Sequence, residues 1–399
     1  MNIAYFTPLP PSRTGIAEYS AGLLPELSSA GLQVDLFTAQ SEVDAELFTR
    51  FTICNYLERP ELLKEVPGYD LAVYHMGNNL EFHEHIYAAA LRHPGLVVLH
   101  DYVLHHLLVA IFLRRRKDRA AYLEEMKYCY GAAGKRLGEQ AFTPPRKRVW
   151  ESGDVIDYPL NDRLIKTSRG VVIHSRFIEE RLRRHHPDAW LRRIDALVVG
   201  GEPVAAESGV RAELGLPDET LLLASFGFMT RVKRIPRVLE ALAALQECLS
   251  VHYLLVGELI DPEIENTIER LGVGACVHTT GYVGEERYMA LMQACDVCIN
   301  LRFPTMGETS AVLCQCLSLG KPGIVTDVGW YAELPDDCVY KVKPDEREIP
   351  MLVSAVSELA TRPDLRRAAG DRGRVYVSER HHKRRIVEAY LEAFRDLAG

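Results

Sequence analysis

Short apolar runs recur along the chain and alternate with longer segments of helical period. In the first half these runs are Asn2–Phe6, Leu32–Thr38, Asp70–His75, Leu96–His100 and Gly170–His174. Continuous apolar runs of this length are typical of strands buried on both faces, as in parallel sheets joined by helices. Between the first two runs, Ile16–Ser29 has the spacing of an amphipathic helix, which Pro25 could kink or end. The pattern predicts an α/β fold.

The second half repeats this alternation. Its apolar runs are Leu221–Phe226, Tyr253–Gly257, His278–Val283, Asp296–Asn300 and Gly323–Thr326. Leu197–Pro203 interrupts the pattern with two glycines and a proline, so we interpret it as a connection between domains. A chain of 399 residues suits that division. We predict an N-terminal domain over 1–198, a C-terminal domain over 199–378, and a C-terminal helix over 379–399 that crosses back to the first domain.

The most informative stretch is Arg302–Val328, RFPTMGETSAVLCQCLSLGKPGIVTDV. After a turn at Gly307, Thr309 or Ser310 can cap a helix by accepting a hydrogen bond from an early backbone N–H. Gly320 can end that helix in the left-handed conformation. Because the first N–H groups of a helix are unpaired and its dipole is positive there, the segment predicts a phosphate site. An ordinary strand–helix–strand unit without a ligand is the alternative.

Polar residues also follow strands in the first half. Asn78 lies just beyond the run that ends at His75, and His100 and Asp101 end the next run. Ligands of open α/β sheets bind beyond the carboxyl ends of strands, so these residues are candidates for a binding site. The group His83-Glu84-His85 is a weaker candidate for a metal site, because neighbours two apart on a helix diverge.

Composition narrows the class of protein. The chain is 47% hydrophobic and 26% charged, and it contains no apolar run long enough to span a membrane. The start MNIAYFTPLPP lacks a charged leader and a cleavage site, so we expect no signal peptide. Nine cysteines without framework spacing indicate a reducing cytoplasm, and we expect them to pack in the core without binding metal.

Charge is unevenly distributed. The net charge is −8, yet residues 114–193 contain 20 Lys/Arg and 11 Asp/Glu. This segment follows the apolar Val103–Leu113, which is either a core helix or a surface helix that receives a lipid-linked acceptor. The basic residues are either solvated helix faces or a surface that meets an anionic acceptor or lipid headgroups.

Several motifs together resemble the retaining glycosyltransferases of family 4. They are the Gly15 loop, His100-Asp101, Val172–Phe177, the Lys233 loop, Gly281-Tyr-Val283 and the segment Gly307–Pro322. The resemblance covers nearly the whole chain in element order. It implies the GT-B architecture, in which two Rossmann-like domains face each other across a cleft that holds the ligand.

The resemblance also implies site residues. His100, Glu308 and Lys233 would act in catalysis, while Asn78 and Asp101 would bind the acceptor. The donor would contact Gly15, Arg231, Lys233, Tyr282, Val283, Gly307, Glu308, Thr309, Ser310 and Gln315. A nucleotide diphosphate sugar is then the co-substrate, and cations with a helix start replace a metal, so no cofactor is expected.

The sequence departs from the common family pattern at three positions. Gln315 stands where a ribose-binding glutamate is usual, and Gly307 occupies the slot of the first glutamate, with Glu308 one residue along. Phe228 replaces an arginine that grips the diphosphate, for which Arg231 is a suggested substitute. The Gly-Glu-Thr-Ser form places this chain with a subset of the family.

Three functional interpretations remain open. The first is a retaining glycosyltransferase that uses front-face attack, since we identify no pair of carboxylates like that of retaining glycosidases. Its acceptor would be a glycan, a lipid-linked or a small molecule, as in polysaccharide biosynthesis. The others are a nucleotide-sugar epimerase of the same architecture and a non-catalytic nucleotide- or glycan-binding protein. We expect no nucleic acid partner and a cytoplasmic protein, with peripheral contact at the inner membrane face as an option.

Overall fold

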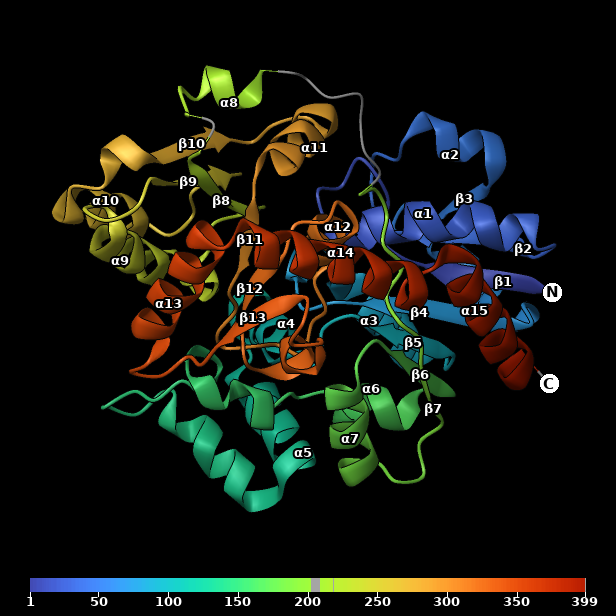
Figure 1. Ribbon diagram of the computed structural model, residues 1–399. Helices are drawn as coiled ribbons and strands as arrows, with labels where there is room; N and C mark the ends of the chain where they lie inside the picture. Colours follow the sequence, from blue (N-terminus) through green and yellow to red (C-terminus); the bar gives the residue numbers. More distant parts are fainter. Residues whose placement is uncertain (202–208, 218, 399) are drawn as a thin grey trace. The chain divides into compact units, whose positions relative to one another are not determined.

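The computed structural model describes residues 1–201, 209–217 and 219–398. The chain forms two compact units (Figure 1). The first contains Met1–Val199, Met306–Thr309 and Lys383–Gly399, and the second contains Gly200–Thr305 and Ser310–His382. The boundary between Val199 and Gly200 falls in the predicted connection, whose end at Pro203 lies outside the described residues.

The first unit is built on a seven-stranded parallel sheet with the order β3-β2-β1-β4-β5-β6-β7. Its strands are β1 Asn2–Phe6, β2 Gln33–Thr38, β3 Thr52–Asn55, β4 Leu71–Met76, β5 Leu96–Leu99, β6 Gly170–Ile173 and β7 Leu191–Arg193. Its helices are α1 Gly15–Ser29, α2 Ala45–Arg50, α3 Leu80–Arg92, α4 His105–Val109, α5 Arg119–Gln140, α6 Asp162–Thr167, α7 Arg176–His185 and α15 Lys383–Ala398. A π-helical turn, Ala110–Arg115, extends α4.

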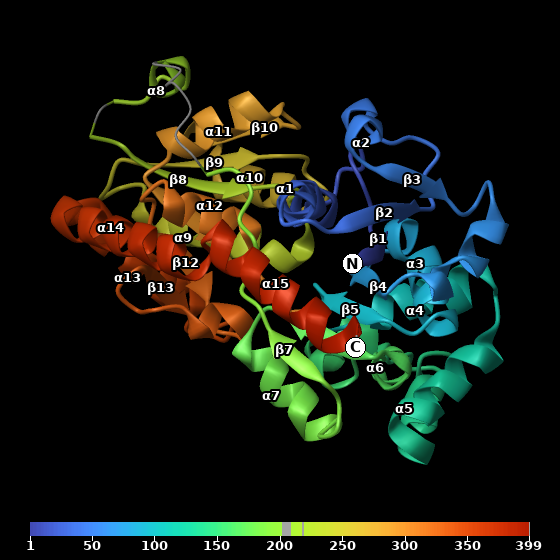
Figure 2. The ribbon, with the colours of Figure 1, turned by 90° about the vertical axis from the view of Figure 1, so that its right-hand side faces the viewer.

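Alternation along β1 explains how this sheet is covered on both faces. Ile3 and Tyr5 face one core, which includes apolar residues of α1 and α15. Ala4 and Phe6 face the other, which includes residues of α3, α4, α5 and α6. Successive side chains of a strand point to opposite faces, so an uninterrupted apolar run fills both cores. Figure 2 shows α15 beside α1 and near β7.

The second unit has a six-stranded parallel sheet with the order β10-β9-β8-β11-β12-β13. Its strands are β8 Leu221–Phe226, β9 Val251–Val256, β10 Val277–Gly281, β11 Val297–Asn300, β12 Gly323–Thr326 and β13 Val339–Val342. Its helices are α8 Val210–Glu213, α9 Ile235–Leu245, α10 Glu263–Leu271, α11 Glu285–Ala294, α12 Ala311–Ser318, α13 Glu348–Thr361 and α14 Pro363–Arg380. The predicted α/β class is confirmed.

Two open points of the sequence are decided here. Pro25 neither ends nor splits α1, which continues to Ser29. The segment Val103–Leu113 is a core segment, because Val103, Leu107 and Leu108 are fully buried. This finding removes the interpretation of that segment as a lipid-receiving surface helix.

The predicted C-terminal helix starting at Glu379 is wrong in its boundary. Glu379 lies near the end of α14, which runs to Arg380, and α15 begins only at Lys383. The two histidines between them interrupt the helical pattern, and His381 is buried with its Nε2 3.8 Å from the Cys314 sulfur.

All nine cysteines are free thiols, and the pairs Cys295/Cys298 and Cys314/Cys316 are buried, as expected for core packing. Within residues 1–201, 209–217 and 219–398, no helix is both long enough and apolar enough to cross a bilayer.

Candidate functional site

Three histidines meet at the carboxyl ends of neighbouring strands of the first sheet. His75 lies on β4, while His100 and His174 follow β5 and β6 directly. Nδ1 of His75 lies 2.9 Å from Nε2 of His100, and the rings of His100 and His174 have centroids 5.0 Å apart. Parallel strands bring their carboxyl ends to one edge, so this juxtaposition follows from the strand order β4-β5-β6.

Burial determines the protonation of this cluster. It lowers the pKa of His75 well below the ordinary histidine value, and the neighbouring imidazoles of His174 and His83 lower it further. Burial and the imidazoles of His174, His75 and His83 do the same to the pKa of His100. Because each imidazole disfavours charge on its neighbours, both side chains are neutral at physiological pH.

Helix α1 covers this edge of the sheet. The Tyr19 ring lies edge-on to His100, with centroids 4.9 Å apart, and its hydroxyl is 2.7 Å from that of Tyr390 on α15. Thr14 caps the helix by accepting from the N–H of Ile16. A Cβ built on Gly15 would meet nothing within 4 Å, so the space above this residue is open.

Asp101 and Asn78 connect the loops after β5 and β4. The Asp101 carboxylate accepts a 2.9 Å hydrogen bond from the backbone N–H of Asn78. The Asn78 amide is itself used by α4, since its oxygen accepts from the N–H of Leu107 and its nitrogen lies 3.2 Å from Nδ1 of His106. Asn78 therefore has a structural task in addition to the predicted role in acceptor binding.

Glu308 belongs to the first unit. The Met306 carbonyl accepts a 3.0 Å hydrogen bond from the N–H of Val103, and the Glu308 carboxylate accepts a 2.6 Å bond from the N–H of Met306. Gly307 is buried with a φ of +79°, and a Cβ there would lie 2.6 Å from Cβ of Tyr102. The segment Met306–Thr309 is thereby packed against the chain that follows His100-Asp101.

The second unit gathers glycine loops at the carboxyl edge of its own sheet. Gly227, Gly257 and Gly281 follow or end β8, β9 and β10, and all three have positive φ. A Cβ on Gly257 would lie 2.4 Å from the carbonyl oxygen of Gly227, so only glycine allows these two loops to approach.

Two cations lie close together at this edge. Lys233 ends the 3₁₀ turn Arg231–Lys233, and its amino group donates a hydrogen bond to the carbonyl of Phe226. The N–H of Phe303 donates to the carbonyl of Val232 over 2.8 Å, which places Arg302 against the same turn. Burial, and after it the positive charge of Arg302, lower the pKa of Lys233 to about 7. A bound anion would stabilise both cations, so this arrangement suits a phosphate group.

Two further positions of this loop are solvent-facing. Phe228, at the position where the sequence resemblance leads one to expect an arginine, is 46% exposed. Arg231 is also exposed, one turn before α9. Arg302 is fixed from behind, because its backbone N–H donates a 2.9 Å bond to the hydroxyl of the fully buried Thr326.

Helix α12 begins as predicted. Ser310, and not Thr309, is its cap, since the Ser310 hydroxyl accepts a 3.2 Å hydrogen bond from the N–H of Leu313. Gly320 has a φ of +73° and follows the helix end. The N–H groups at the helix start are therefore those of Ala311 and Val312, a few residues beyond Gly307.

Gln315 lies on α12 beside the connection between the units. A Cβ on Gly200 would lie 3.2 Å from its amide nitrogen, and Gly201 accepts a 2.9 Å bond from the Ser318 hydroxyl. Tyr282 follows the edge strand β10 and is 57% exposed, with Val283 partly exposed next to it. Both positions are accessible to a ligand.

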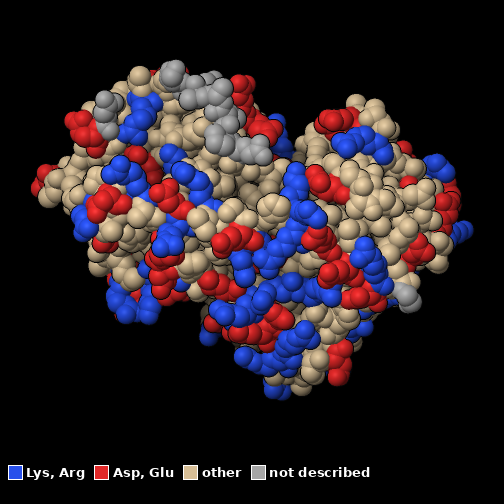
Figure 3. Space-filling view, turned by 45° about the vertical axis from the view of Figure 1, so that its right-hand side comes forward, with Lys and Arg blue, Asp and Glu red and all other residues tan. Residues whose placement is uncertain are grey.

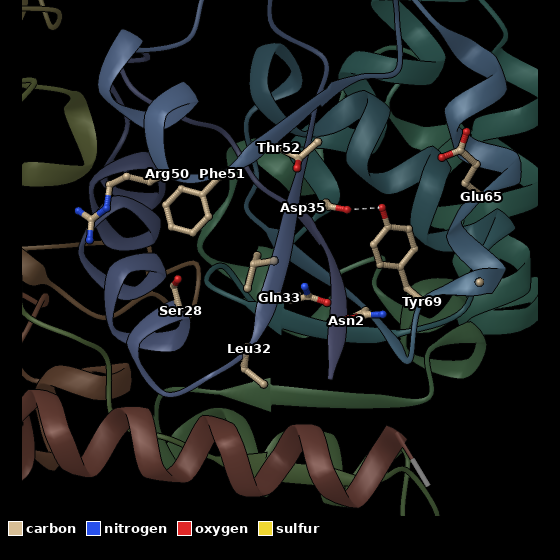
Figure 4. Close-up of a pocket in the computed structure, with 12 residues that line it drawn as sticks. Asn2, Ser28, Leu32, Gln33, Asp35, Arg50, Phe51, Thr52, Glu65 and Tyr69 are labelled. Atoms are coloured by element: carbon tan, nitrogen blue, oxygen red, sulfur yellow. Dashed lines mark hydrogen bonds between the residues drawn. The ribbon is translucent and has the colours of Figure 1, made fainter.

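A pocket of about 540 Å³ in the first unit is lined by none of the candidate site residues. Its lining includes Asn2, Gln33 and Thr52, which start β1, β2 and β3 (Figure 4). It therefore opens at the amino ends of the strands, whereas His75 and His100 lie at the carboxyl ends. A 2.6 Å hydrogen bond from the Tyr69 hydroxyl to Asp35 crosses one side of it.

The basic segment 114–193 is largely neutralised by local pairs. Arg163 pairs with Glu125, Lys166 with Asp162, and Arg193 with Glu179. Figure 3 shows Lys and Arg side chains interspersed with Asp and Glu over the face in view. Arg114, Arg115 and Arg116 are exposed, and Arg115 lies 3.2 Å from Glu84.

Comparison with known proteins gives a family match for part of the chain. Residues 220–362 match the family model described as glycosyl transferases group 1. Apart from Met306–Thr309, these residues belong to the second unit. No curated protein matches the chain at a significant level. Among the described residues, no group of three or more His, Cys, Asp and Glu is placed to hold a metal ion.

Solved structures extend the likeness to the whole chain. A sucrose-phosphate synthase from Thermosynechococcus elongatus has a TM-score of 0.69 and 18% identity, covering 100% of this chain and 99% of that one. HepE from Anabaena, solved in complex with UDP, has a TM-score of 0.68 and 15% identity, covering 99% and 100%. WaaG, a glycosyltransferase involved in lipopolysaccharide biosynthesis, has a TM-score of 0.63 and 16% identity, covering 100% of both. These likenesses show the GT-B fold, and with the family match they support a GT-B glycosyltransferase.

The sequence did not reveal three residues of the site. His75 and His174 were strand-end histidines without an assigned role, and their meeting with His100 depends on strand order. Arg302 was the first residue of the informative stretch, but its closeness to Lys233 requires β11 to lie beside β8. A cation immediately after a buried strand was the only signal available.

Proposed function

We propose that this protein is a retaining glycosyltransferase of family 4 that transfers a sugar from a nucleotide diphosphate sugar to an acceptor. The observation that carries the proposal is the pair Lys233 and Arg302 beside the glycine loops of the second sheet. Their positive charges match a diphosphate. Without a ligand, the pKa of Lys233 is about 7, so this side chain is about half protonated at neutral pH. The pair lies within the residues that match group 1 glycosyl transferases.

The two units divide the work in this proposal. The second unit holds the donor: Lys233, Arg302 and the start of α12 contact the diphosphate, while Tyr282 and Val283 border the base. Gln315 would contact the ribose through its amide. The first unit supplies His100 and Glu308 to the sugar, with Gly15, Asn78 and Asp101 on the acceptor side.

The reaction breaks the bond between the anomeric carbon and the diphosphate oxygen, and the acceptor oxygen bonds to the same face of that carbon. The acceptor proton passes to the departing phosphate oxygen, so atoms and charge balance. Positive charge develops on the ring and negative charge on the leaving group. Lys233 and Arg302 stabilise the leaving group electrostatically, which is the main source of rate enhancement in such a site. No resident cofactor or metal is required.

Arg302 replaces the arginine that the family usually has at the position of Phe228. The exposed Arg231 was the substitute suggested by sequence. Arg302, however, is the cation whose positive charge lowers the pKa of Lys233. We assign Arg302 as the second diphosphate ligand and leave Arg231 as an auxiliary contact at the entrance.

The acceptor is proposed to be a glycan or a lipid-linked sugar of polysaccharide biosynthesis. The exposed Arg114–Arg116 cluster of the first unit supports an anionic acceptor. We place the enzyme in the cytoplasm, where nine free thiols are stable, with peripheral contact at the inner membrane face.

The test begins with donor binding. Because HepE was solved with UDP, thermal shift with UDP, GDP and ADP is the first measurement. A ligand that binds only the folded state adds about 2.7 kcal/mol to the free energy of unfolding at 100 times its Kd. The midpoint temperature of unfolding rises accordingly. No shift with any nucleotide would contradict the proposal.

Turnover separates the alternatives. Incubation with the preferred nucleotide sugar, in EDTA, should release the sugar to water or acceptor with its anomeric configuration retained, as followed by NMR. Interconversion of the intact donor would instead indicate an epimerase. Binding without turnover would indicate a nucleotide-binding protein, a second candidate that the substitutions at Phe228 and Gln315 favour.

A further inference from the structure

We propose that His75 is a positioning residue that fixes His100 in one tautomer, with its proton on Nδ1. The inference rests on the proposed function in taking His100 as the residue that contacts the sugar. It concerns the histidine pair at the carboxyl ends of β4 and β5, of which only His100 was a candidate from the sequence.

The hydrogen bond between the two rings can be made in two ways. Either His75 donates through Nδ1–H to Nε2 of His100, or Nε2–H of His100 donates to Nδ1 of His75, over the same 2.9 Å. In each case a neutral imidazole carries one proton, so the choice fixes both tautomers.

Burial of the opposite nitrogen of His75 decides between them. Its Nε2 is buried and has no hydrogen-bond partner within the part of the chain that the structure describes. Nε2 lacks a partner in both arrangements, so the choice is between a buried unpaired N–H donor in the second and a buried unpaired acceptor nitrogen in the first. Buried N–H groups without an acceptor are the rarer of the two in folded proteins. In the first arrangement Nε2 is a bare imidazole nitrogen and His75 uses its only proton, so the first arrangement is favoured.

The same reasoning places a donor on His100. With Nε2 accepting from His75, the proton of His100 lies on Nδ1. That nitrogen forms no hydrogen bond to any described residue and is not among the fully buried polar atoms. His100 therefore offers a neutral N–H donor at the carboxyl edge of the sheet, where a sugar hydroxyl can accept it.

Neutrality matters for the proposed chemistry. A charged imidazolium beside a sugar ring that is gaining positive charge would oppose the reaction, whereas a neutral donor orients the sugar without this penalty. Burial and the flanking imidazoles keep His100 uncharged. The remaining task, choosing which nitrogen carries the proton, falls to His75.

A purely packing role for His75 makes different predictions. The His75 ring also contacts Tyr5, with centroids 4.7 Å apart, so its removal alone could disturb the core. His75→Asn keeps an amide N–H close to the position of Nδ1 and keeps most of the volume. His75→Leu keeps the volume and removes the donor.

The test compares these variants by ¹⁵N NMR of histidine-labelled protein, which reports the tautomer of His100 without any need for activity. In the wild type we expect the Nδ1–H tautomer, retained in His75→Asn and lost or mixed in His75→Leu. Outer hydrogen-bond partners of metal-bound histidines are worth about 10–100-fold in activity. We expect a loss of kcat of that order in His75→Leu, most of which His75→Asn should recover.

A matched control exists in the second unit. Nδ1 of His252 and Nε2 of His278 are also 2.9 Å apart, at a site remote from the carboxyl edge. His252→Leu should change the signals of His278 and leave kcat unchanged. A wild-type His100 that carries its proton on Nε2, or a tautomer unchanged in His75→Leu, overturns the inference even if the enzyme is active. The expected tautomer shift in a protein without transferase activity would instead refute the proposed function alone.

Discussion

The backbone N–H of Val103 donates a 3.0 Å hydrogen bond to the carbonyl oxygen of Met306. This bond joins two segments far apart in the sequence, the loop after His100-Asp101 and the turn that carries Gly307-Glu308. Both belong to the same compact unit, while Lys233 and Arg302 belong to the other. The segment Gly307–Pro322 is therefore divided: Glu308 belongs to the first unit and helix α12 to the second.

Alanine at two glycines should separate packing from ligand contact. At Gly307, φ is +79° and a new Cβ would lie 2.5 Å from Ile178 and 2.6 Å from Tyr102. Gly307→Ala should lower the free energy of unfolding by more than the 1–2 kcal/mol typical of left-handed alanine, and kcat should fall as Glu308 is displaced. A Cβ added at Gly15 would have no neighbour within 4 Å. The stability of Gly15→Ala should therefore equal that of the wild type, while its Michaelis constants rise. Urea unfolding and initial rates measure both; equal stability of the two variants would contradict the packing account.

Removal of either Lys233 or Arg302 should impair the chemical step. Loss of one preorganised charge typically costs about 10²–10³ in rate, so Lys233→Ala and Arg302→Ala should each lower kcat by that factor. Arg237→Ala is the control, because Arg237 is exposed and pairs with Glu240. If Arg302→Ala keeps half the wild-type kcat while Arg231→Ala does not, the second diphosphate ligand has been assigned to the wrong arginine.

Diphosphate binding should take up a proton. Lys233 has a pKa of about 7 in the free protein, below its ordinary value of 10.5, so it is mostly neutral at pH 8. A nearby diphosphate favours the charged form and raises that pKa, so UDP binding at pH 8 should absorb up to about one proton, and less at pH 6. Calorimetry in buffers of different ionisation enthalpy measures the number. Lys233→Arg, always charged, should show no uptake; an unchanged value would assign the proton to another group.

The same lysine makes stability depend on pH. Its folded pKa lies below the unfolded value, so between about pH 7 and 10.5 the unfolded chain binds more protons, and this contribution to stability rises with pH.

Glu308→Gln should impair catalysis more than Gln315→Ala does. The Glu308 carboxylate is held by the N–H of Met306 beside the His100 loop, whereas Gln315 is a neutral amide next to Gly200. Initial rates at saturating donor give the ranking. The opposite ranking would show that Gln315, one helix turn into α12, is the group that positions the donor.

The salt dependence of the acceptor tests the basic cluster. Exposed charges are screened beyond roughly 8–10 Å at physiological ionic strength, so the acceptor Michaelis constant should rise with salt more than the donor constant. Replacing Arg114, Arg115 and Arg116 with glutamine should remove most of this difference. A triple replacement at the exposed Arg367, Arg372 and Arg380 of α14 is the charge-matched control. Equal salt dependence in both triple variants would leave Arg114–Arg116 as a solvated surface.

Local patterns were sufficient to predict the framework. The runs at Asn2–Phe6, Leu221–Phe226 and Gly323–Thr326 are strands with the predicted bounds, because buried parallel strands need uninterrupted apolar residues. Ser310 and Gly320 bound α12 as capping chemistry requires. These features depend only on residues close in the sequence.

The candidate site could be predicted only in part, because its remaining geometry comes from contacts distant in the sequence. The approach of Arg302 to Lys233 requires β11 beside β8, and the meeting of His75, His100 and His174 requires the order β4-β5-β6. The attachment of Glu308 to the first unit rests on a backbone bond between Val103 and Met306, for which neither residue has a side-chain signature. Sequence periodicity contains none of this information.

Helix α15 gives the chain an unusual order of completion. Tyr390 and Phe394, among the last residues of the sequence, fill the same core as Ile3 and Tyr5, and Tyr19 hydrogen-bonds to Tyr390. A growing polypeptide that has passed Val199 thus still lacks one wall of its first core, and the apolar face of α1 stays uncovered while the second unit is synthesised. Contacts between residues so distant in sequence slow folding, and apolar surface that is prone to aggregation stays exposed in the meantime. The first half of this protein is therefore the last to mature, and it should be the half that depends most on chaperones during translation.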